Sequence, residues 1–300
     1  MARYLITGGT GFIGSRLLEH LAASGHEAVV ITRNPARHKN RCGEQVSYYK
    51  GFDELKSSEV FHTVINLAGE GIGDRRWSEK RKQALYNSRI GMTHSLVEYL
   101  STLSDKPEVM ISGSAIGWYG AHDNSLLTEE ARSNSEYTHE LCEAWEQAAA
   151  GVRDLGIRLC IVRLGVVLGQ GGGVLKRLLP PFYLGLGGRI GSGQQMMTWV
   201  HREDVIHAFD FLVETPSVEG VFNLTAPNAV SNAEFTRQLG KSVHRPTLLP
   251  LPGFVVRLVF GEMGDRLLLH GQNVVPARLQ DAGFSFRFER LDEAFTDLFS

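Results

Sequence analysis

The sequence predicts an α/β protein with a doubly wound parallel sheet and a smaller C-terminal domain, and three observations support this. Short apolar runs alternate with amphipathic segments of helix length through the first half of the chain. A glycine-rich turn joins the first apolar run to the first amphipathic segment. After Gly165 the alternation weakens, and the last part of the 300-residue chain is rich in proline and leucine. Such strand–helix alternation gives right-handed crossovers and a parallel sheet that helices cover on both faces.

The expected elements follow in order along the chain. The strands are short apolar runs at Tyr4–Thr7, Ala28–Thr32, Val46–Tyr49, Thr63–Asn66, Val109–Ser112 and Leu159–Val162. The helices are amphipathic segments at Ser15–Ala23, Glu79–Tyr99 and Tyr137–Arg153. A Gly-rich passage, residues 169–193, precedes a helix at Asp204–Leu212 and a strand at Gly220–Leu224. We expect Asp204 to cap its helix, since it stands just before an apolar run.

Composition argues against several classes of protein. The formal net charge is −2, which does not fit the broad basic face of a nucleic-acid binder. No apolar run approaches the roughly 18–20 residues that a membrane span needs. Cys42, Cys142 and Cys160 are odd in number and widely spaced, which favours reduced thiols over disulfides or a metal site. The first residues carry no export signal, so we expect a cytoplasmic protein.

The turn after the first strand has the pattern of a phosphate-binding loop. Residues 7–14 read TGGTGFIG and lie between a strand and an apolar-periodic helix. Glycine allows the sharp turn, the close approach of a pyrophosphate and the tight packing of helix on sheet. The free N–H groups of the helix then bind the pyrophosphate. The sequence therefore predicts a Rossmann sheet whose cofactor contacts in this loop are Gly8, Gly11, Phe12, Ile13 and Gly14.

The end of the second strand indicates which dinucleotide binds. A domain specific for NAD usually has an acidic residue there, which holds the ribose hydroxyls. This chain has Thr32 and Arg33 instead, and Arg37, Lys39 and Arg41 follow in the same loop. A guanidinium pairs with a phosphate in bidentate geometry, and the missing carboxylate would have repelled that phosphate. We therefore predict NADP as the cofactor, with Thr32 and Arg33 at its adenosine end.

The change of pattern along the chain predicts two domains. The NADP-binding domain is assigned to residues 1–165 and 196–225, and the smaller substrate domain to residues 166–195 and 226–300. Glycines permit close backbone approach and motion, so residues 185–193 are expected to form a lid or wall over the substrate. Trp199 and His201 are candidates for lining the same cleft.

Several motifs resemble those of the extended short-chain dehydrogenase/reductase superfamily, in particular an epimerase-like subgroup. The pieces are TGGTGFIG (7–14), NLAGEGI (66–72), RRW (75–77), SR (88–89), ISGSAIGWYG (111–120), LCEAWE (141–146), VRLGVVLG (162–169), PPFYLGLGGRIGSGQQ (180–195), WVH (199–201) and GQNVVPARLQDAGFSF (271–286). The resemblance covers nearly the whole chain. It implies that Asn66, Leu67, Ala68 and Gly69 lie along the cofactor and that Arg89 reaches its phosphates or ribose.

The resemblance also implies a reaction and a catalytic hydroxyl. The reaction is reversible hydride transfer on a hydroxyl or carbonyl of a small polar substrate, of which a nucleotide sugar is one example. Ser114 matches the serine at the strand end that orients this group. A homo-oligomer is compatible with the class, and no nucleic acid, membrane or metal ion is implied.

The usual acid–base pair of the superfamily is broken in this chain. In relatives, a Tyr-x-x-x-Lys pair follows the serine-bearing strand, and the ammonium group lowers the phenol pKa so that tyrosine transfers a proton. If Tyr137 is the tyrosine, Leu141 takes the lysine position. If Glu146 sets the register, the pair becomes Thr138 and Cys142. Neither alignment keeps the lysine.

Other groups could supply the proton. Tyr137 remains a candidate without its activating lysine, and the ordinary pKa of His139 suits proton transfer near neutral pH. Tyr119 and Glu70 are further alternatives. The sequence thus leaves two functions open. The retained Ser114 favours an NADP(H)-dependent oxidoreductase or epimerase-like enzyme, whereas the missing lysine favours an NADP(H)-binding sensor or scaffold without turnover.

Overall fold

The computed structural model describes residues 1–38, 42–122 and 124–300 of the chain, and a seven-stranded parallel sheet forms its centre. The strand order is β11-β7-β5-β4-β1-β2-β3. The strands are β1 (Arg3–Thr7), β2 (Glu27–Ile31), β3 (Val46–Tyr49), β4 (Thr63–Asn66), β5 (Val109–Ala115), β7 (Arg158–Leu164) and β11 (Gly220–Leu224). Because the chain order reverses between β1 and β4, a crevice for a ligand is expected beyond the carboxyl ends of these two strands. The predicted α/β fold is confirmed.

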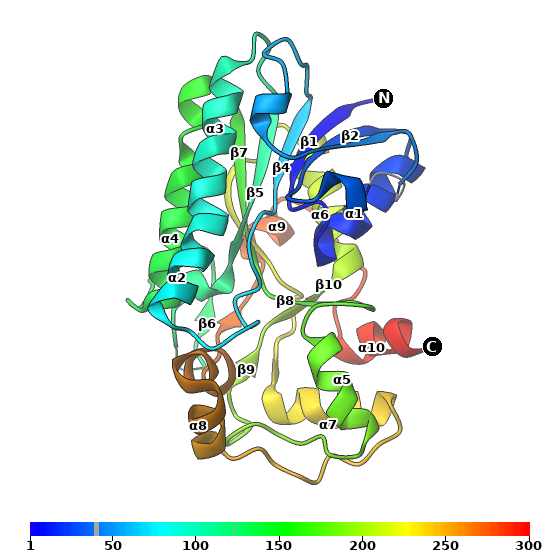
Figure 1. Ribbon diagram of the computed structural model, residues 1–300. Coiled ribbons are helices and arrows are strands. Elements are labelled where there is room, and N and C mark those ends of the chain that lie inside the picture. Colours follow the sequence, from blue (N-terminus) through cyan, green and yellow to red (C-terminus); the bar gives the residue numbers. More distant parts are fainter. Residues whose placement is uncertain (39–41, 123) are drawn as a thin grey trace.

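Helices cover both faces of this sheet (Figure 1). On one face α1 (Phe12–Ala23) packs beside α6 (Arg202–Glu214). On the other, α3 (Met92–Thr102) packs beside α4 (Tyr137–Ala150). Each pair buries its own apolar cluster against the sheet, since leucines of α1 and α6 belong to one core and leucines of α3 to the other. The runs of fully buried residues in β1, β4 and β5 reflect this cover on both sides.

The segment predicted as one helix at Glu79–Tyr99 is interrupted. It consists of α2 (Glu79–Tyr86), a π-helical turn η3 (Asn87–Gly91) and α3. Single π-turns inside α-helices frequently mark functional sites, because the extra residue redirects side chains. Arg89, a predicted cofactor contact, lies in this turn.

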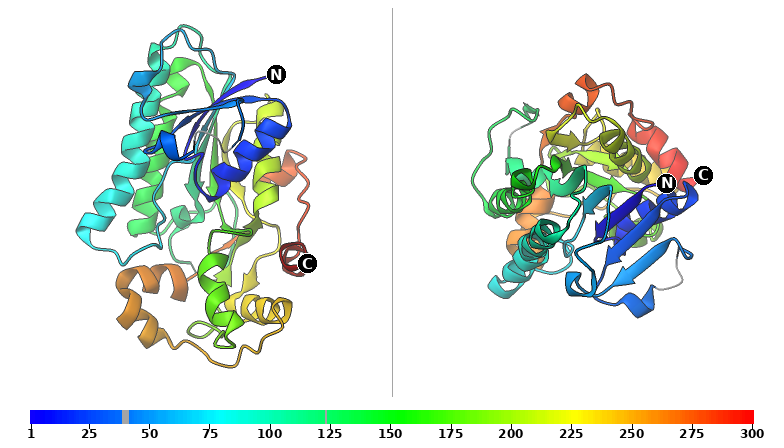
Figure 2. Two further views of the ribbon diagram at one scale, coloured as in Figure 1. Left: turned by 45° about the vertical axis from the view of Figure 1, so that its right-hand side comes forward. Right: turned by 90° about the horizontal axis from the view of Figure 1, so that it is seen from above.

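A second group of elements surrounds a separate apolar core at the lower end of the molecule (Figures 1 and 2). It contains the two-stranded pairs β8 (Val166–Leu168) with β10 (Trp199–His201) and β9 (Met196–Met197) with β12 (Val230–Ser231). Helices α5 (Leu175–Tyr183), α7 (Asn232–Ser242) and α10 (Leu291–Phe299) contribute to this core, and α8 (Gly253–Gly264) also lies at this end of the molecule. The chain enters this group just after β7 ends.

Short elements complete the structure. They are η1 (Pro35–Arg37), η2 (Phe52–Glu54), η4 (Ile116–Tyr119), η5 (Arg153–Leu155), the π-turn η6 (Asp265–Leu269), α9 (Ala277–Asp281), and the pair β6 (Leu126–Leu127) with β13 (Asn273–Val274). The sequence did not predict α5, because Pro180 and Pro181 lie inside it.

The prediction that Asp204 caps α6 was wrong. The helix begins at Arg202, and its cap is His201, whose Nδ1 accepts the backbone N–H of Glu203 at 3.2 Å. Asp204 instead accepts the backbone N–H groups of Arg287 and Phe288 at 2.8 and 3.1 Å. The apolar run starts at Val205, three residues after the first residue of the helix, and so it predicted a cap too far along the chain.

Candidate functional site

The phosphate loop has the backbone that its glycines predict. Gly8 has φ +71°, and a Cβ atom there would overlap the carbonyl group of Leu67 at the end of β4. A Cβ atom on Gly14 would overlap the carbonyl oxygen of Gly8. At Gly11 a Cβ atom would have a single close neighbour, the Gly8 carbonyl oxygen at 3.2 Å. Gly8 and Gly14 are therefore required by packing within the protein, while Gly11 leaves the space in front of α1 open.

The first turn of α1 offers unpaired backbone donors. The first helical bond runs from the Ser15 N–H to the Gly11 carbonyl at 2.9 Å, so the N–H groups of Phe12, Ile13 and Gly14 precede it. Gly11 is the N-cap and makes no side-chain cap bond. Such a helix start binds anions through its N–H groups and its dipole.

The side chains of Phe12 and Ile13 serve a different purpose from their N–H groups. A Cβ atom on Gly173 would lie 2.8 Å from the Phe12 ring, and the guanidinium carbon of Arg202 lies 4.9 Å from the ring centroid. Ile13 packs against the core beneath α1. These contacts fix the loop against the 169–173 segment and the sheet.

The end of β2 carries a cation that points across the loop. Thr32 continues the pairing of β2, since its N–H donates to the Tyr49 carbonyl at 2.9 Å. The Arg33 side chain is 84% exposed, and its Nη1 lies 3.3 Å from Oε1 of Glu70, which follows β4. Arg37 lies in η1, whereas Lys39 and Arg41 fall outside the described residues.

The Asn66–Gly69 stretch holds the centre of the sheet together. The buried Asn66 amide accepts from Thr7 Oγ1 at 2.6 Å and donates to Thr93 and Ser112 hydroxyls at 2.8 and 3.2 Å. The Leu67 N–H donates to the Thr7 carbonyl at 3.0 Å. Asn66 is thus saturated by protein groups, and the path along the sheet edge is left to Leu67, Ala68 and Gly69.

Arg89 lies directly beneath this path. Its Nη2 donates to the Glu70 carbonyl at 2.9 Å and its Nη1 to the Leu85 carbonyl at 3.3 Å. Its guanidinium carbon is 5.3 Å from the Trp145 ring centroid and would lie 3.0 Å from a Cβ atom on Gly69. Burial lowers the pKa of Arg89. A fixed guanidinium therefore stands at the carboxyl end of β4.

The packing of α4 distinguishes the two registers of the broken pair. A Cβ atom on Gly117, just after β5, would lie 3.2 Å from Thr138 Cβ and 3.7 Å from Cys142 Sγ. Leu141 packs instead in the cluster with Leu85 and Ile90. Thr138 and Cys142 therefore face the segment just after the serine-bearing strand, whereas Leu141 faces α2 and η3.

Ser114 belongs to a buried polar network. Its hydroxyl donates to Glu146 Oε1 at 2.6 Å, and both oxygens of Glu146 accept from Arg163 at 2.8 and 2.9 Å. The Arg163 guanidinium lies 3.5 Å from the Trp118 ring centroid and donates to Tyr119 Oη at 3.3 Å. Ser114, Arg163 and Tyr119 are all at most 3% exposed. The hydroxyl that the sequence assigns to a substrate thus has an internal partner.

The other predicted acid–base groups have hydrogen-bond partners of their own. The Tyr137 hydroxyl donates to the Lys82 carbonyl at 3.4 Å, and burial raises the pKa of this tyrosine to about 12. His139 Nδ1 donates to the Trp118 carbonyl at 2.6 Å. Tyr119 donates to Asn223 at 2.7 Å, and burial raises its pKa. None of these hydrogen bonds joins Tyr137 or His139 to Ser114.

Sequence reasoning missed a polar cluster at the start of α4. Glu136 accepts from Thr138 Oγ1 at 2.7 Å and from Arg266 Nη1 at 3.2 Å, and its side chain is 10% exposed. Arg266 comes from η6, 130 residues further along the chain. No local pattern could pair these two residues, although Glu136 stands directly before the expected tyrosine.

Three residues predicted near the cleft have structural partners. Trp199 is fully buried and donates to the Asn228 carbonyl at 3.1 Å. His201 is 2% exposed, and burial lowers its pKa to about 4. Gly188 lies so close to Leu249 that a Cβ atom would overlap its carbonyl oxygen, so this glycine of the 185–193 segment is required by a neighbouring backbone.

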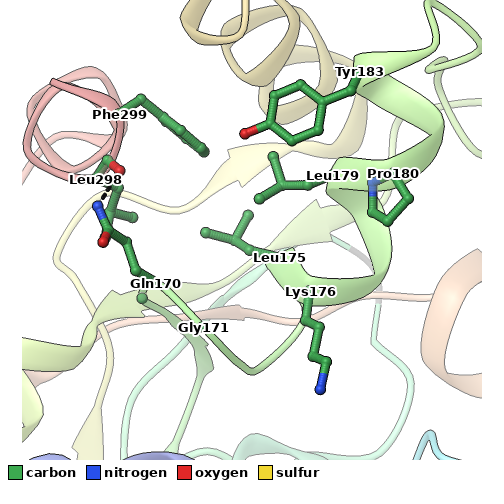
Figure 3. A pocket seen from close by; sticks show the side chains of 10 residues that line it. Gln170, Gly171, Leu175, Lys176, Leu179, Pro180, Tyr183, Leu298 and Phe299 are labelled. Carbon is green, nitrogen blue, oxygen red and sulfur yellow. Dashed lines mark hydrogen bonds between the residues drawn. The ribbon is translucent and has the colours of Figure 1, made fainter.

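Two cavities lie on the smaller group of elements. One, of about 280 Å³, is lined mainly by apolar side chains of α5 and α10, among them Leu175, Tyr183 and Phe299 (Figure 3). The other, of about 310 Å³, is more polar and contains Arg202 and Arg287. Neither contains any of the predicted cofactor or catalytic residues. The candidate site is therefore the carboxyl end of the sheet, where the predicted residues follow the strands, rather than these cavities.

Comparison with known proteins agrees with the loop and sheet geometry. The family described as "NAD dependent epimerase/dehydratase family" matches residues 4–225. This chain belongs to that family. A second match, to a "domain of unknown function (DUF1731)", covers residues 251–298, which include α8, α9 and most of α10.

Relatives of this epimerase family match over nearly the whole chain. "Epimerase family protein SDR39U1" of Mus musculus is 36% identical over 99% of both chains. The "Epimerase family protein SDR39U1 homolog, chloroplastic" of Arabidopsis thaliana is 35% identical over 96% of this chain and 84% of its own length. The crystal structure of human epimerase family protein SDR39U1 (isoform 2) with NADPH superposes with a TM-score of 0.88 at 33% identity, covering 99% of this chain and 98% of that one.

Two further findings concern location and metals. Among the described residues, no helix has the length and apolar character to cross a bilayer. Within that same part of the chain, no group of three or more His, Cys, Asp or Glu side chains is arranged to hold a metal ion. The Arabidopsis relative is named chloroplastic, so the cytoplasmic location of this epimerase-family chain stays a prediction.

Proposed function

We propose that this chain is an NADP(H)-dependent oxidoreductase or epimerase-like enzyme that acts on a hydroxyl or carbonyl of a small polar substrate. One observation carries the proposal. The first turn of α1 presents unpaired N–H groups beside Gly11, and Arg33 follows the neighbouring strand without an acidic residue in its place. The human relative solved with NADPH supports the same cofactor.

The residues present fit this cofactor at three points. The N–H groups of Phe12, Ile13 and Gly14 would hold the pyrophosphate, with Gly11 leaving room for it. Arg33 would pair with the 2′-phosphate, and Arg89 would donate to the ribose near the nicotinamide. When bound, the cofactor would supply or accept a hydride at its nicotinamide ring.

Arg89 would also supply the positive charge that the missing lysine provides in relatives. It is a fixed cation from the turn beside α4, and it lies against Trp145, one turn beyond Cys142. A positive charge at this position lowers the pKa of both Tyr137 and Cys142, although burial outweighs it in each case. Glu136 would then hold or release the proton, and the Thr138 hydroxyl, which donates to it at the start of α4, would relay that proton to and from the substrate.

A second function has its own support. Ser114 is bonded to Glu146, and Cys142, which takes the lysine position if Thr138 takes that of the tyrosine, has a pKa that burial raises to about 12. These groups are poor donors and acceptors of protons at neutral pH. They favour a protein that binds NADP(H) as a sensor or scaffold and turns over little or nothing.

One experiment separates the two functions. NADPH and NADH binding are measured by fluorescence titration, and NADPH oxidation is then followed with a panel of carbonyl compounds that includes nucleotide sugars. The enzyme proposal expects tight NADPH binding and oxidation with at least one substrate, which Glu136→Gln abolishes without loss of NADPH affinity. Tight binding without oxidation across the panel would favour the sensor, and equal affinity for the two cofactors would reject the assignment of Arg33.

A further inference from the structure

The carboxylate of Glu70, which follows β4, lies between two arginines at the carboxyl end of the sheet. One oxygen faces Arg33 Nη1 at 3.3 Å. The other is paired with Arg81 Nη1 of α2. The hydrogen bond from Arg81, opposed by some burial, keeps the pKa of Glu70 below its usual value, so this carboxylate is ionised at neutral pH.

The two partners of Glu70 differ in how firmly they are held. The Arg81 side chain is 11% exposed and also donates to the Gly71 carbonyl at 2.7 Å. The backbone of Glu70 is fixed as well, since its N–H donates to Ser88 Oγ at 3.1 Å and its carbonyl accepts from Arg89 at 2.9 Å. Arg33 is 84% exposed. The carboxylate is therefore a fixed acceptor, and Arg33 is the partner that can move.

The ion pair joins two segments at the point where the strand order reverses. Arg33 follows β2 and Glu70 follows β4, and β1 with its phosphate loop lies between these two strands. The Arg33–Glu70 ion pair therefore joins the segments on either side of β1 and its phosphate loop. A carboxylate and a phosphate offer a guanidinium the same kind of paired oxygens.

We propose that Glu70 is an internal substitute for the cofactor's 2′-phosphate, which holds Arg33 in the free protein and competes with the phosphate for it. The inference rests on the proposed function, namely that the chain binds NADP(H). NADPH must draw Arg33 away from Glu70. NADH has no group for Arg33, so the pair with Glu70 persists when NADH binds. Glu70 thereby reduces the preference for NADPH that Arg33 alone would give.

Glu70→Gln tests the competition in the full-length protein. An exposed ion pair shifts an equilibrium by at most about fivefold, so this variant should bind NADPH about two- to fivefold more tightly. The change in NADH affinity that Glu70→Gln causes should be no larger than the change that Glu79→Gln causes. Glu79→Gln is the matched control because it removes the same charge. Glu79 lies on α2, and its side chain is 96% exposed. Dissociation constants come from fluorescence titration at one fixed salt concentration.

A double variant separates competition from simple charge repulsion. In an Arg33→Ala background, Glu70→Gln should no longer alter NADPH affinity, because the shared partner is gone. Equal tightening with and without Arg33, equal tightening of NADPH and NADH, or no tightening at all would each overturn the competition. If the parent protein prefers NADPH and Glu70→Gln leaves the NADPH affinity unchanged, this inference is rejected and the proposed function is not. A parent protein without NADPH preference rejects the proposed function with it.

Discussion

The phosphate loop and the face between β5 and α4 lie at the same edge of one sheet, yet they relate to their ligands in opposite ways. The loop has backbone donors left free and a side-chain-free space at Gly11. The β5–α4 face has side chains that are already paired, since Ser114 bonds to Glu146 and Glu146 to Arg163. The phosphate loop therefore has donors available for a ligand, whereas the polar side chains of the β5–α4 face are already bonded to other side chains of the protein.

The two regions differ because one depends on the backbone and the other on side chains. Cofactor binding depends on backbone geometry that a few glycines define locally. Catalysis would depend on side chains from several elements, and at the β5–α4 face Ser114 and Glu146 already bond to groups of the protein. The epimerase fold of this chain is therefore better evidence for a bound dinucleotide than for any particular reaction.

The largest expected effect concerns the closed face. Glu146→Ala should lower the free energy of unfolding by about 3–5 kcal/mol, because it leaves the buried Arg163 guanidinium without its partner. Ser114→Ala should cost only about 1 kcal/mol, since Glu146 keeps Arg163. Chemical denaturation measures both, and Glu143→Ala is the control because its side chain, on the same helix, is 50% exposed. A loss below about 1 kcal/mol for Glu146→Ala would mean that this face is not closed by the network.

The next effect concerns the open loop. Gly11→Val should weaken NADPH binding by about 100-fold or more, roughly 2.7 kcal/mol, because its side chain would fill the space before α1. Its melting temperature should change little. Gly14→Val should lose binding and also stability, because its Cβ atom overlaps the Gly8 carbonyl. If Gly11→Val bound NADPH as the parent does, the space before α1 would not be the pyrophosphate site.

A smaller effect tests the cation at the end of β2. Arg33→Asp should change the ratio of NADPH to NADH affinity by about tenfold in favour of NADH, which corresponds to about 1.4 kcal/mol. The carboxylate repels the 2′-phosphate and can accept from a ribose hydroxyl. Fluorescence titration with both cofactors measures the ratio, and Arg37→Asp in η1 serves as the control. An unchanged ratio would place the source of specificity elsewhere in the crevice.

The smallest effect is the pH dependence of the closed face. Burial raises the pKa of Cys142 from 9.0 to about 12. The unfolded thiol therefore loses its proton above pH 9 while the folded thiol keeps it, so the unfolding free energy falls as the pH rises. One pH unit above this onset, the loss should be about 1 kcal/mol. Cys142→Ala should lack that part of the alkaline loss in denaturation curves, and identical slopes for both proteins would show that the thiol is accessible to solvent.

Much of the molecule is determined by the sequence alone, for a local reason. Strand runs, helix periodicity and the TGGTGFIG turn are each defined by residues near one another in the chain, and these gave the sheet, the loop and the position of Arg33. The π-turn at Asn87–Gly91 and the helix through Pro180 were missed, because tertiary packing overrides local preference there.

Only the tertiary structure decided what the site's side chains do. Whether Tyr137 or Thr138 faces β5 depends on the rotation of α4 about its axis, which its packing on α2 and η3 sets. The pairings of Ser114 with Glu146, Glu136 with Arg266, and Arg33 with Glu70 join residues that are 32 to 130 positions apart. A hydrogen bond needs its two atoms to be about 3 Å apart in space, whatever the separation of the residues in sequence. No local sequence pattern could therefore predict these three pairings.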